Sequence, residues 1–207
     1  MDYSNFNEEK KLWGRGFECV VGLDEAGRGP LAGPVTAAAV SVSYKVHKVI
    51  KLQGINDSKK LSEKRREELY EILTNHPDIM WRVGIVDEKE IDRINILQAT
   101  KLAMHRAIEK LQPDYILIDG NFLLDGVTIN QSSIIKGDAK VFSIAAASII
   151  AKVTRDRIML KMHEKYPEYD FQKHKGYGTM AHMAALKKFG PCDIHRKTFF
   201  PVSAMVQ

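Results

Sequence analysis

The sequence contains few cysteines: only Cys19 and Cys192 occur among its 207 residues, and they do not form a C-x-x-C pair. This scarcity excludes a small disulfide-stabilised fold and a zinc site built on paired cysteines, and it favours a reducing compartment. The chain also lacks an apolar run of about 20 residues, the length that a transmembrane helix needs. Residues 1–6 lack the basic-then-apolar order of a signal peptide. We therefore expect a cytoplasmic protein without membrane contact.

Internal repeats, low-complexity segments and linkers are absent as well. A composition of 44% hydrophobic and 28% charged residues is that of an ordinary globular protein with a sizeable core. The length suits one large domain. We expect an N-terminal arm over residues 1–18, a single domain over residues 19–201 that includes a helical C-terminal part, and a tail over residues 202–207. We expect the chain to be a monomer.

The net charge of +5 is unevenly distributed along the chain. Residues 136–200 carry a net charge of +7, whereas the remainder carries −2. A basic region beside an acid-bearing core suits a partner with a phosphate backbone. Solvated basic helix faces also occur in proteins that bind no nucleic acid, so charge alone leaves both interpretations open.

Hydrophobic patterns along the chain alternate between those of strands and those of helices. We expect strands over residues 19–24, 35–43, 79–86 and 115–120, a further strand from 127–129 and 133–136, and helices over 62–73, 87–111, 141–166 and 180–189. Ser62 is a favourable N-cap residue, and Gly190 followed by Pro191 ends the last helix. A helix between the third and fourth strands implies a crossover, so the fourth strand can run parallel to an earlier one. The pattern predicts an α/β fold with C-terminal helices.

The first predicted strand ends in Asp24-Glu25 and then breaks into the glycine turn Gly27-Arg28-Gly29. Residues 27–32 formally match the dinucleotide fingerprint G-x-G-x-x-A, but that fingerprint must open a helix. Here prolines and a second strand follow at once, which disfavours dinucleotide binding. A surface turn with solvated charges is the other simple interpretation. Glycine has no Cβ, so this turn also lets a ligand approach the backbone closely.

Carboxylates recur at the ends of predicted strands and before the longest helix. Asp24 and Glu25 end the first strand, Asp119 ends the fourth, and Asp138 precedes the helix at 141–166. If the two strands are parallel neighbours, their acids share one edge of the sheet. Converging carboxylates repel each other unless hard cations such as Mg²⁺ or Mn²⁺ lie between them. Carboxylate sites that hold two such ions are typical of enzymes that cut phosphodiesters. Taken singly, Asp119 and Asp138 fit cap or turn residues equally well.

Other polar residues have a simpler interpretation. His163, His174, His182 and His195 are scattered and lack zinc-site spacing, so we expect surface or hydrogen-bonded histidines. We expect Asp156 to form an ion pair on a helix surface.

Several short motifs together give the sequence a family resemblance. In order along residues 17–201, the chain resembles bacterial ribonuclease HII in the motifs at Asp24–Pro30, Asp57–Leu61, Asp119–Gly120, Lys136–Lys140, His174–Thr179 and His195–Pro201. Each motif alone is weak, but their common order is specific. Thr198 departs from the family pattern, in which serine is commoner.

The resemblance implies an RNase H-like fold, with a mixed five-stranded sheet flanked by helices, for the catalytic domain over residues 19–201. It implies catalytic metal ligands for Mn²⁺ or Mg²⁺ at Asp24, Glu25, Asp119 and Asp138. It further implies contacts with the substrate from Gly27, Arg28, Gly29, Lys59, Lys60 and Tyr177. Backbone groups of the glycine turn would grip the ribonucleotide, Tyr177 would stack beside it, and the lysines would contact phosphates.

The implied activity is that of an endoribonuclease. It would hydrolyse the RNA strand of RNA–DNA hybrids and incise 5′ of single ribonucleotides in duplex DNA, leaving a 5′-phosphate and a 3′-hydroxyl. Two alternatives are a non-catalytic nucleic-acid-binding module of the same fold and an RNase H-like nuclease that acts on DNA alone. The four acids argue against the first, and the glycine turn with Tyr177 argues against the second. Contact of the tail with a replication clamp stays open.

Overall fold

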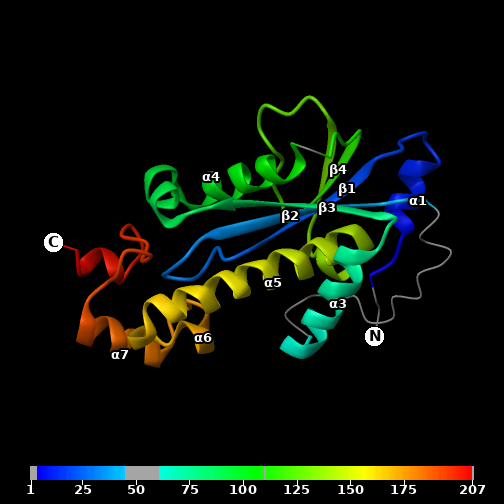
Figure 1. The fold of residues 1–207 in the computed structure, drawn as a ribbon. Helices are drawn as coiled ribbons and strands as arrows, with labels where there is room; N and C mark the ends of the chain where they lie inside the picture. Colours follow the sequence, from blue (N-terminus) through cyan, green and yellow to red (C-terminus); the bar gives the residue numbers. More distant parts are fainter. Residues whose placement is uncertain (1–3, 45–60, 110, 207) are drawn as a thin grey trace.

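The computed structural model describes residues 4–44, 61–109 and 111–206. A five-stranded sheet in the order β3-β2-β1-β4-β5 forms the centre of the fold (Figure 1). Its strands are β1 (Val20–Ala26), β2 (Val35–Val42), β3 (Ile79–Val86), β4 (Tyr115–Asp119) and β5 (Asn130–Ile134). β2 pairs antiparallel with both β1 and β3, whereas β4 pairs in parallel with both β1 and β5. The predicted mixed five-stranded sheet is confirmed, as is the parallel fourth strand.

The position of β5 corrects one prediction. The strand expected from residues 127–129 and 133–136 is instead a single strand at Asn130–Ile134. Its polar residues are held by side-chain hydrogen bonds: Ser132 Oγ lies 2.6 Å from Tyr115 Oη, and Gln131 bonds both backbone groups of Leu124 at 2.8 and 2.9 Å. Because these bonds take the place of apolar burial, hydrophobicity did not reveal the strand.

Helices cover both faces of the sheet (Figure 1). α4 (Glu88–Ile108) packs on one face, and α5 (Phe142–Lys165) and α3 (Glu63–Asn75) pack on the other. Every residue of β2 is buried, because this strand is covered on both faces. The caps follow the expected chemistry: the Ser62 side chain accepts the N–H of Arg65 at 3.2 Å, and the Asp87 side chain accepts that of Glu90 at 2.9 Å.

The first helix, α1 (Asn7–Trp13), packs against the start of α5, where Leu12 shares an apolar cluster with Ile144. Its Glu9 is buried, and Oε1 accepts the backbone N–H of Ser143 at 2.8 Å. Burial is the main reason that the pKa of Glu9 is raised above its ordinary value. The hydrogen bond between Glu9 and Ser143 therefore joins the predicted N-terminal arm, as far as it is described, to the domain that contains the sheet.

The C-terminal part, residues 166–206, lies around the C-terminal end of α5 (Figure 1). It contains η3 (Pro167–Tyr169), α6 (Phe171–His174), α7 (Met180–Phe189) and η4 (Val202–Ala204). Leu31 and Ala32, from the loop after β1, share its apolar core with Phe171 and Leu186. The loop that follows the first strand is thereby fixed to the end of the chain. None of the described helices is long and apolar enough to cross a membrane.

Candidate active site

Strand alternation places Asp24 and Asp119 on the same face of the sheet. Leu23 of β1 is paired with Ile118 of β4, and both side chains are buried in the core on the α4 side. Successive side chains point to opposite faces of a strand, so the next residue of each strand points toward α5. Because the strands are parallel neighbours, the two carboxylates lie side by side at the same sheet edge.

The third carboxylate comes from the short helix η2 (Gly137–Ala139), which carries Asp138 just before α5. The start of α5 lies directly against β1: a Cβ added at Gly22 would stand 2.3 Å from the Ser143 carbonyl carbon. Only glycine permits that approach. The backbone N–H of Gly137 also donates to Asp119 Oδ1 at 2.7 Å, which joins η2 to the end of β4.

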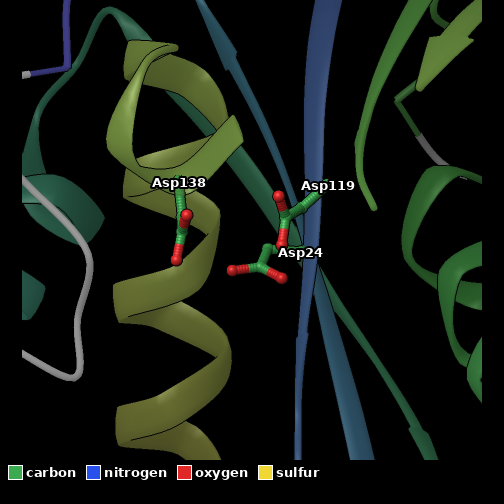
Figure 2. A group of neighbouring side chains, drawn as sticks. All are labelled: Asp24, Asp119 and Asp138. Carbon is green, nitrogen blue, oxygen red and sulfur yellow. The ribbon is translucent and has the colours of Figure 1, made fainter. Parts of the chain in front are cut away.

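Asp24, Asp119 and Asp138 together form a compact cluster, with oxygens that all lie within 4.8 Å of one another (Figure 2). Asp24 and Asp138 are buried. The pKa of Asp24 is raised well above its usual range, first by burial and then by the charges of Glu25 and Asp119. The N–H of Glu25, which donates to Asp24 at 2.7 Å, offsets part of that effect. Among the described residues, neither Asp24 nor Asp119 forms an ion pair with a basic side chain that would offset its negative charge. This oxygen-only donor set fits a hard divalent cation.

Glu25 borders the cluster without belonging to it. Its Oε1 lies 3.3 Å from Arg28 Nη1, and its charge acts on Asp24. Three of the four predicted metal ligands therefore converge, and the fourth lies beside them in the adjoining pocket.

The pocket beside the carboxylates contains most of the predicted substrate-contacting residues. It has a volume of about 180 Å³, and its lining comprises Asp24, Glu25, Ala26, Gly27, Arg28, Gly29, Ser148, Lys152 and Tyr177. Tyr177 is 43% exposed, and its ring edge would lie 3.8 Å from a Cβ placed on Gly29. Lys59 and Lys60 lie outside the described residues.

Two pocket residues on α5 escaped the sequence prediction. Ser148 and Lys152 are four residues apart, so they face the pocket from successive turns, and that spacing is the one signal the sequence offered. Lys152 Nζ lies 2.7 Å from Asp156 Oδ1 and 5.9 Å from the centre of the Tyr177 ring. Burial lowers the pKa of Lys152. The expected ion pair of Asp156 is therefore present, but Asp156 is buried and not on the surface.

His174, His182 and His195 are hydrogen-bonded, as expected, but they are not scattered. His182 Nε2 lies 3.0 Å from His195 Nε2, and the His174 and His182 rings stack with centroids 4.5 Å apart. These buried rings lie in the C-terminal part, where Cys192 Sγ is 3.1 Å from His195 Nδ1. Folding brings them together from three segments, so local spacing could not reveal the cluster.

A mixed sheet whose parallel strands end in clustered carboxylates, with a third from η2, is the arrangement expected of a metal-dependent nuclease with an RNase H-like fold. Known proteins identify the family. The sequence profile described as Ribonuclease HII matches residues 21–202. The chain belongs to the ribonuclease HII family and is a metal-dependent ribonuclease H.

Relatives and solved structures agree with this assignment. Ribonuclease HII of Acetivibrio thermocellus is 55% identical over 92% of this chain and 73% of its own length. Ribonuclease HII of Chlamydia caviae is 52% identical over 96% of this chain and 92% of its own length. Ribonuclease H2 of Pyrococcus horikoshii superimposes with a TM-score of 0.73 at 30% identity, covering 90% of this chain and 96% of that one. The structure of the PCNA:RNase HII complex from Archaeoglobus fulgidus gives a TM-score of 0.74 at 28% identity, covering 87% and 95%.

Proposed function

We propose that this enzyme hydrolyses the RNA strand of RNA–DNA hybrids and also incises duplex DNA on the 5′ side of a single embedded ribonucleotide. The observation that carries the proposal is the pocket in which the glycine turn and Tyr177 adjoin the carboxylate cluster. A site that recognises one ribonucleotide needs close donors for its 2′-hydroxyl next to the reacting phosphate, since that hydroxyl distinguishes RNA from DNA.

Asp24, Asp119 and Asp138, with Glu25 beside them, would hold Mg²⁺ or Mn²⁺. Two bound ions would supply an activated water and stabilisation of the leaving 3′ oxygen, giving a 5′-phosphate and a 3′-hydroxyl. The side chains themselves fix the location of the reaction, because two come from strand ends and one from η2, just before α5.

The remaining pocket residues would hold the substrate. The glycine turn offers backbone donors, and the partly exposed Tyr177 ring offers a stacking surface beside them. Lys152 places a positive charge at the same pocket, where a phosphate would lie. Lys59 and Lys60, which lie outside the described residues, keep their predicted role as phosphate contacts.

Three duplexes test the proposal: one with a single ribonucleotide, one long RNA–DNA hybrid and one of DNA alone, each with and without Mg²⁺ or Mn²⁺. We expect cleavage of the first two only, and only with metal. Binding without cleavage would favour a non-catalytic module, and cleavage of the all-DNA duplex would favour a DNA nuclease.

Tyr177→Ala tests the stacking role. Stacking on an aromatic ring contributes roughly 1–3 kcal/mol per base, so the rate on the single-ribonucleotide duplex should fall by about 5- to 150-fold. The loss should be smaller on the long hybrid, where many registers offer alternative contacts. Phe189→Ala is the matched control, since Phe189 is 48% exposed but does not line the pocket. Equal losses on both substrates would mean that Tyr177 is structural.

The proposal extends to two properties of the whole molecule. We expect a monomer, which the elution volume on size-exclusion chromatography with light scattering will test. The archaeal neighbour was solved in complex with PCNA, and in this chain Met205 and Val206, which follow η4, are 38% and 40% exposed. A contact between residues 202–207 and a sliding clamp predicts that truncation after Pro201 abolishes clamp binding without changing cleavage.

A further inference from the structure

Two buried arginines lie under the loop that follows β1. Arg155 of α5 and Arg196 near the C-terminal end of the chain are 1% and 0% exposed, which is unusual for charged side chains. The loop over residues 27–34 belongs to no helix or named strand, so its inward carbonyl groups need donors from elsewhere. The two guanidinium groups supply those donors.

Arg196 holds the glycine turn itself. Its guanidinium donates to the carbonyl oxygens of Gly27 at 2.6 Å, Arg28 at 2.9 Å and Gly33 at 3.0 Å. In a trans peptide the C=O and N–H groups point in opposite directions. Turning the first two carbonyls toward Arg196 therefore turns the N–H groups of Arg28 and Gly29 away from it. Within residues 4–44, 61–109 and 111–206, neither of these N–H groups donates to a backbone carbonyl.

Arg155 joins the same loop to the segment that carries Tyr177. It donates to the carbonyl oxygens of Pro34 at 2.9 Å, Lys175 at 3.0 Å and Ala32 at 3.1 Å. Its guanidinium carbon lies 6.0 Å from the centre of the Tyr177 ring. A Cβ at Gly27 would stand 2.1 Å from Arg155 Nε, and Gly27 has a φ of +97°. The turn can follow this path only with glycine at position 27.

Neither arginine forms an ion pair with a carboxylate among the described residues. Burial lowers the pKa of Arg155 to about 10 and that of Arg196 to about 9, values at which both stay charged near neutral pH. Their partners are five carbonyl groups of the loop and that of Lys175, so the two positive charges orient the backbone and also favour an anionic ligand above it.

We propose that Arg155 and Arg196 are positioning residues that set the selectivity for a single ribonucleotide, by fixing the outward N–H groups of the glycine turn and the place of Tyr177 beside them. The proposal rests on the proposed function, because it assigns a cause to the recognition of the 2′-hydroxyl. Neither side chain is expected to touch the substrate.

The test compares Arg196→Lys and Arg155→Lys with the wild type on the single-ribonucleotide duplex and on a long hybrid. Lysine keeps the charge but cannot bond three carbonyls in the plane of a guanidinium fork. The measured quantity is the ratio of kcat/KM for the two substrates, in which the fraction of correctly folded enzyme cancels. Losing charged hydrogen bonds should lower that ratio by at least about tenfold. Arg157→Lys is the matched control, since Arg157 lies on the same helix but pairs with Glu67 and Glu71 of α3.

The outcomes separate this proposal from the proposed function. A wild type that cuts neither ribonucleotide substrate would refute the proposed function. A wild type that cuts both, with an unchanged ratio in both variants, would refute the positioning role and leave the function standing. If Arg196→Lys does not accumulate as folded protein, the ratio for Arg155→Lys decides. An equally lowered ratio in Arg157→Lys would also overturn the proposal, because a substitution that leaves the loop carbonyls untouched would then change the selectivity as much as one beneath the loop.

Discussion

Replacing Asp119 by asparagine should inactivate the enzyme and at the same time stabilise the metal-free fold. Asp119 Oδ1 accepts the Gly137 N–H at 2.7 Å, and an asparagine side-chain oxygen can keep that bond in the same volume. The substitution therefore removes one negative charge from the carboxylate cluster and little else.

The size of the stabilisation follows from the cluster's geometry. Its oxygens lie within 4.8 Å of one another, and two unit charges at that separation repel by about 3 kcal/mol at an effective dielectric constant of about 20. Asp119 is only half-buried, so solvent screening reduces the gain to about 1–3 kcal/mol. For a chain of this length, that gain corresponds to a rise in Tm of roughly 2 to 12 °C without metal.

Catalysis should change in the opposite direction. Losing several kcal/mol of metal-dependent stabilisation should lower kcat on a ribonucleotide-containing duplex by at least about a thousandfold. Added Mg²⁺ should raise the Tm of the wild type more than that of Asp119→Asn, because a ligand stabilises the state that binds it. Asp125→Asn is the control, since Asp125 is an exposed acid paired with Lys101.

Differential scanning fluorimetry with and without metal, together with cleavage assays, provides both readouts. Cleavage within a few-fold of the wild type would remove Asp119 from the site. A lowered Tm in the absence of metal would show that the cluster is not repulsive, and the electrostatic reasoning would then be wrong.

The sheet and the acids could be predicted because their signals are local. The apolar runs that end in Asp24 and Asp119 mark buried strands, and the intervening helix implied the parallel pairing that places the two carboxylates together. The convergence of Asp138 depends on Gly22, whose missing Cβ lets α5 approach β1. That convergence followed only from the family resemblance, since spacing alone does not show which strand a helix crosses.

The features that sequence reasoning missed depend on contacts between distant segments. Arg155 and Arg196 look like ordinary basic residues in a basic region, yet folding buries both against carbonyls more than 100 residues away. Lys152 lies in the same basic region of the sequence, and nothing local in the sequence shows that it lines the pocket. A positive charge within the basic region can thus be a solvated face, a phosphate contact or a support for backbone, and only burial and partners distinguish these roles.

Three further predictions concern binding, packing and pH. The affinity for duplex should fall linearly with salt on a log–log plot, as counterion release requires; a flat response in fluorescence anisotropy would mean that the basic region is merely solvated. Gly22→Val should destabilise the fold by several kcal/mol and lower cleavage, because its Cβ would stand 2.3 Å from Ser143; an unchanged urea midpoint would contradict this packing. The free energy of unfolding should decrease as pH falls from about 6.5 toward 4, because burial lowers the pKa of both His182 and His195 from 6.5 to about 4. In that range these two histidines bind protons in the unfolded chain but stay neutral in the folded protein. Above that range they are neutral in both states, and their contribution to the free energy of unfolding is fully present. Each histidine contributes a slope of at most about 1.4 kcal/mol per pH unit, so His182→Gln should lower the slope measurably in urea titrations. An identical slope in wild type and variant would show that the buried pair does not govern acid stability.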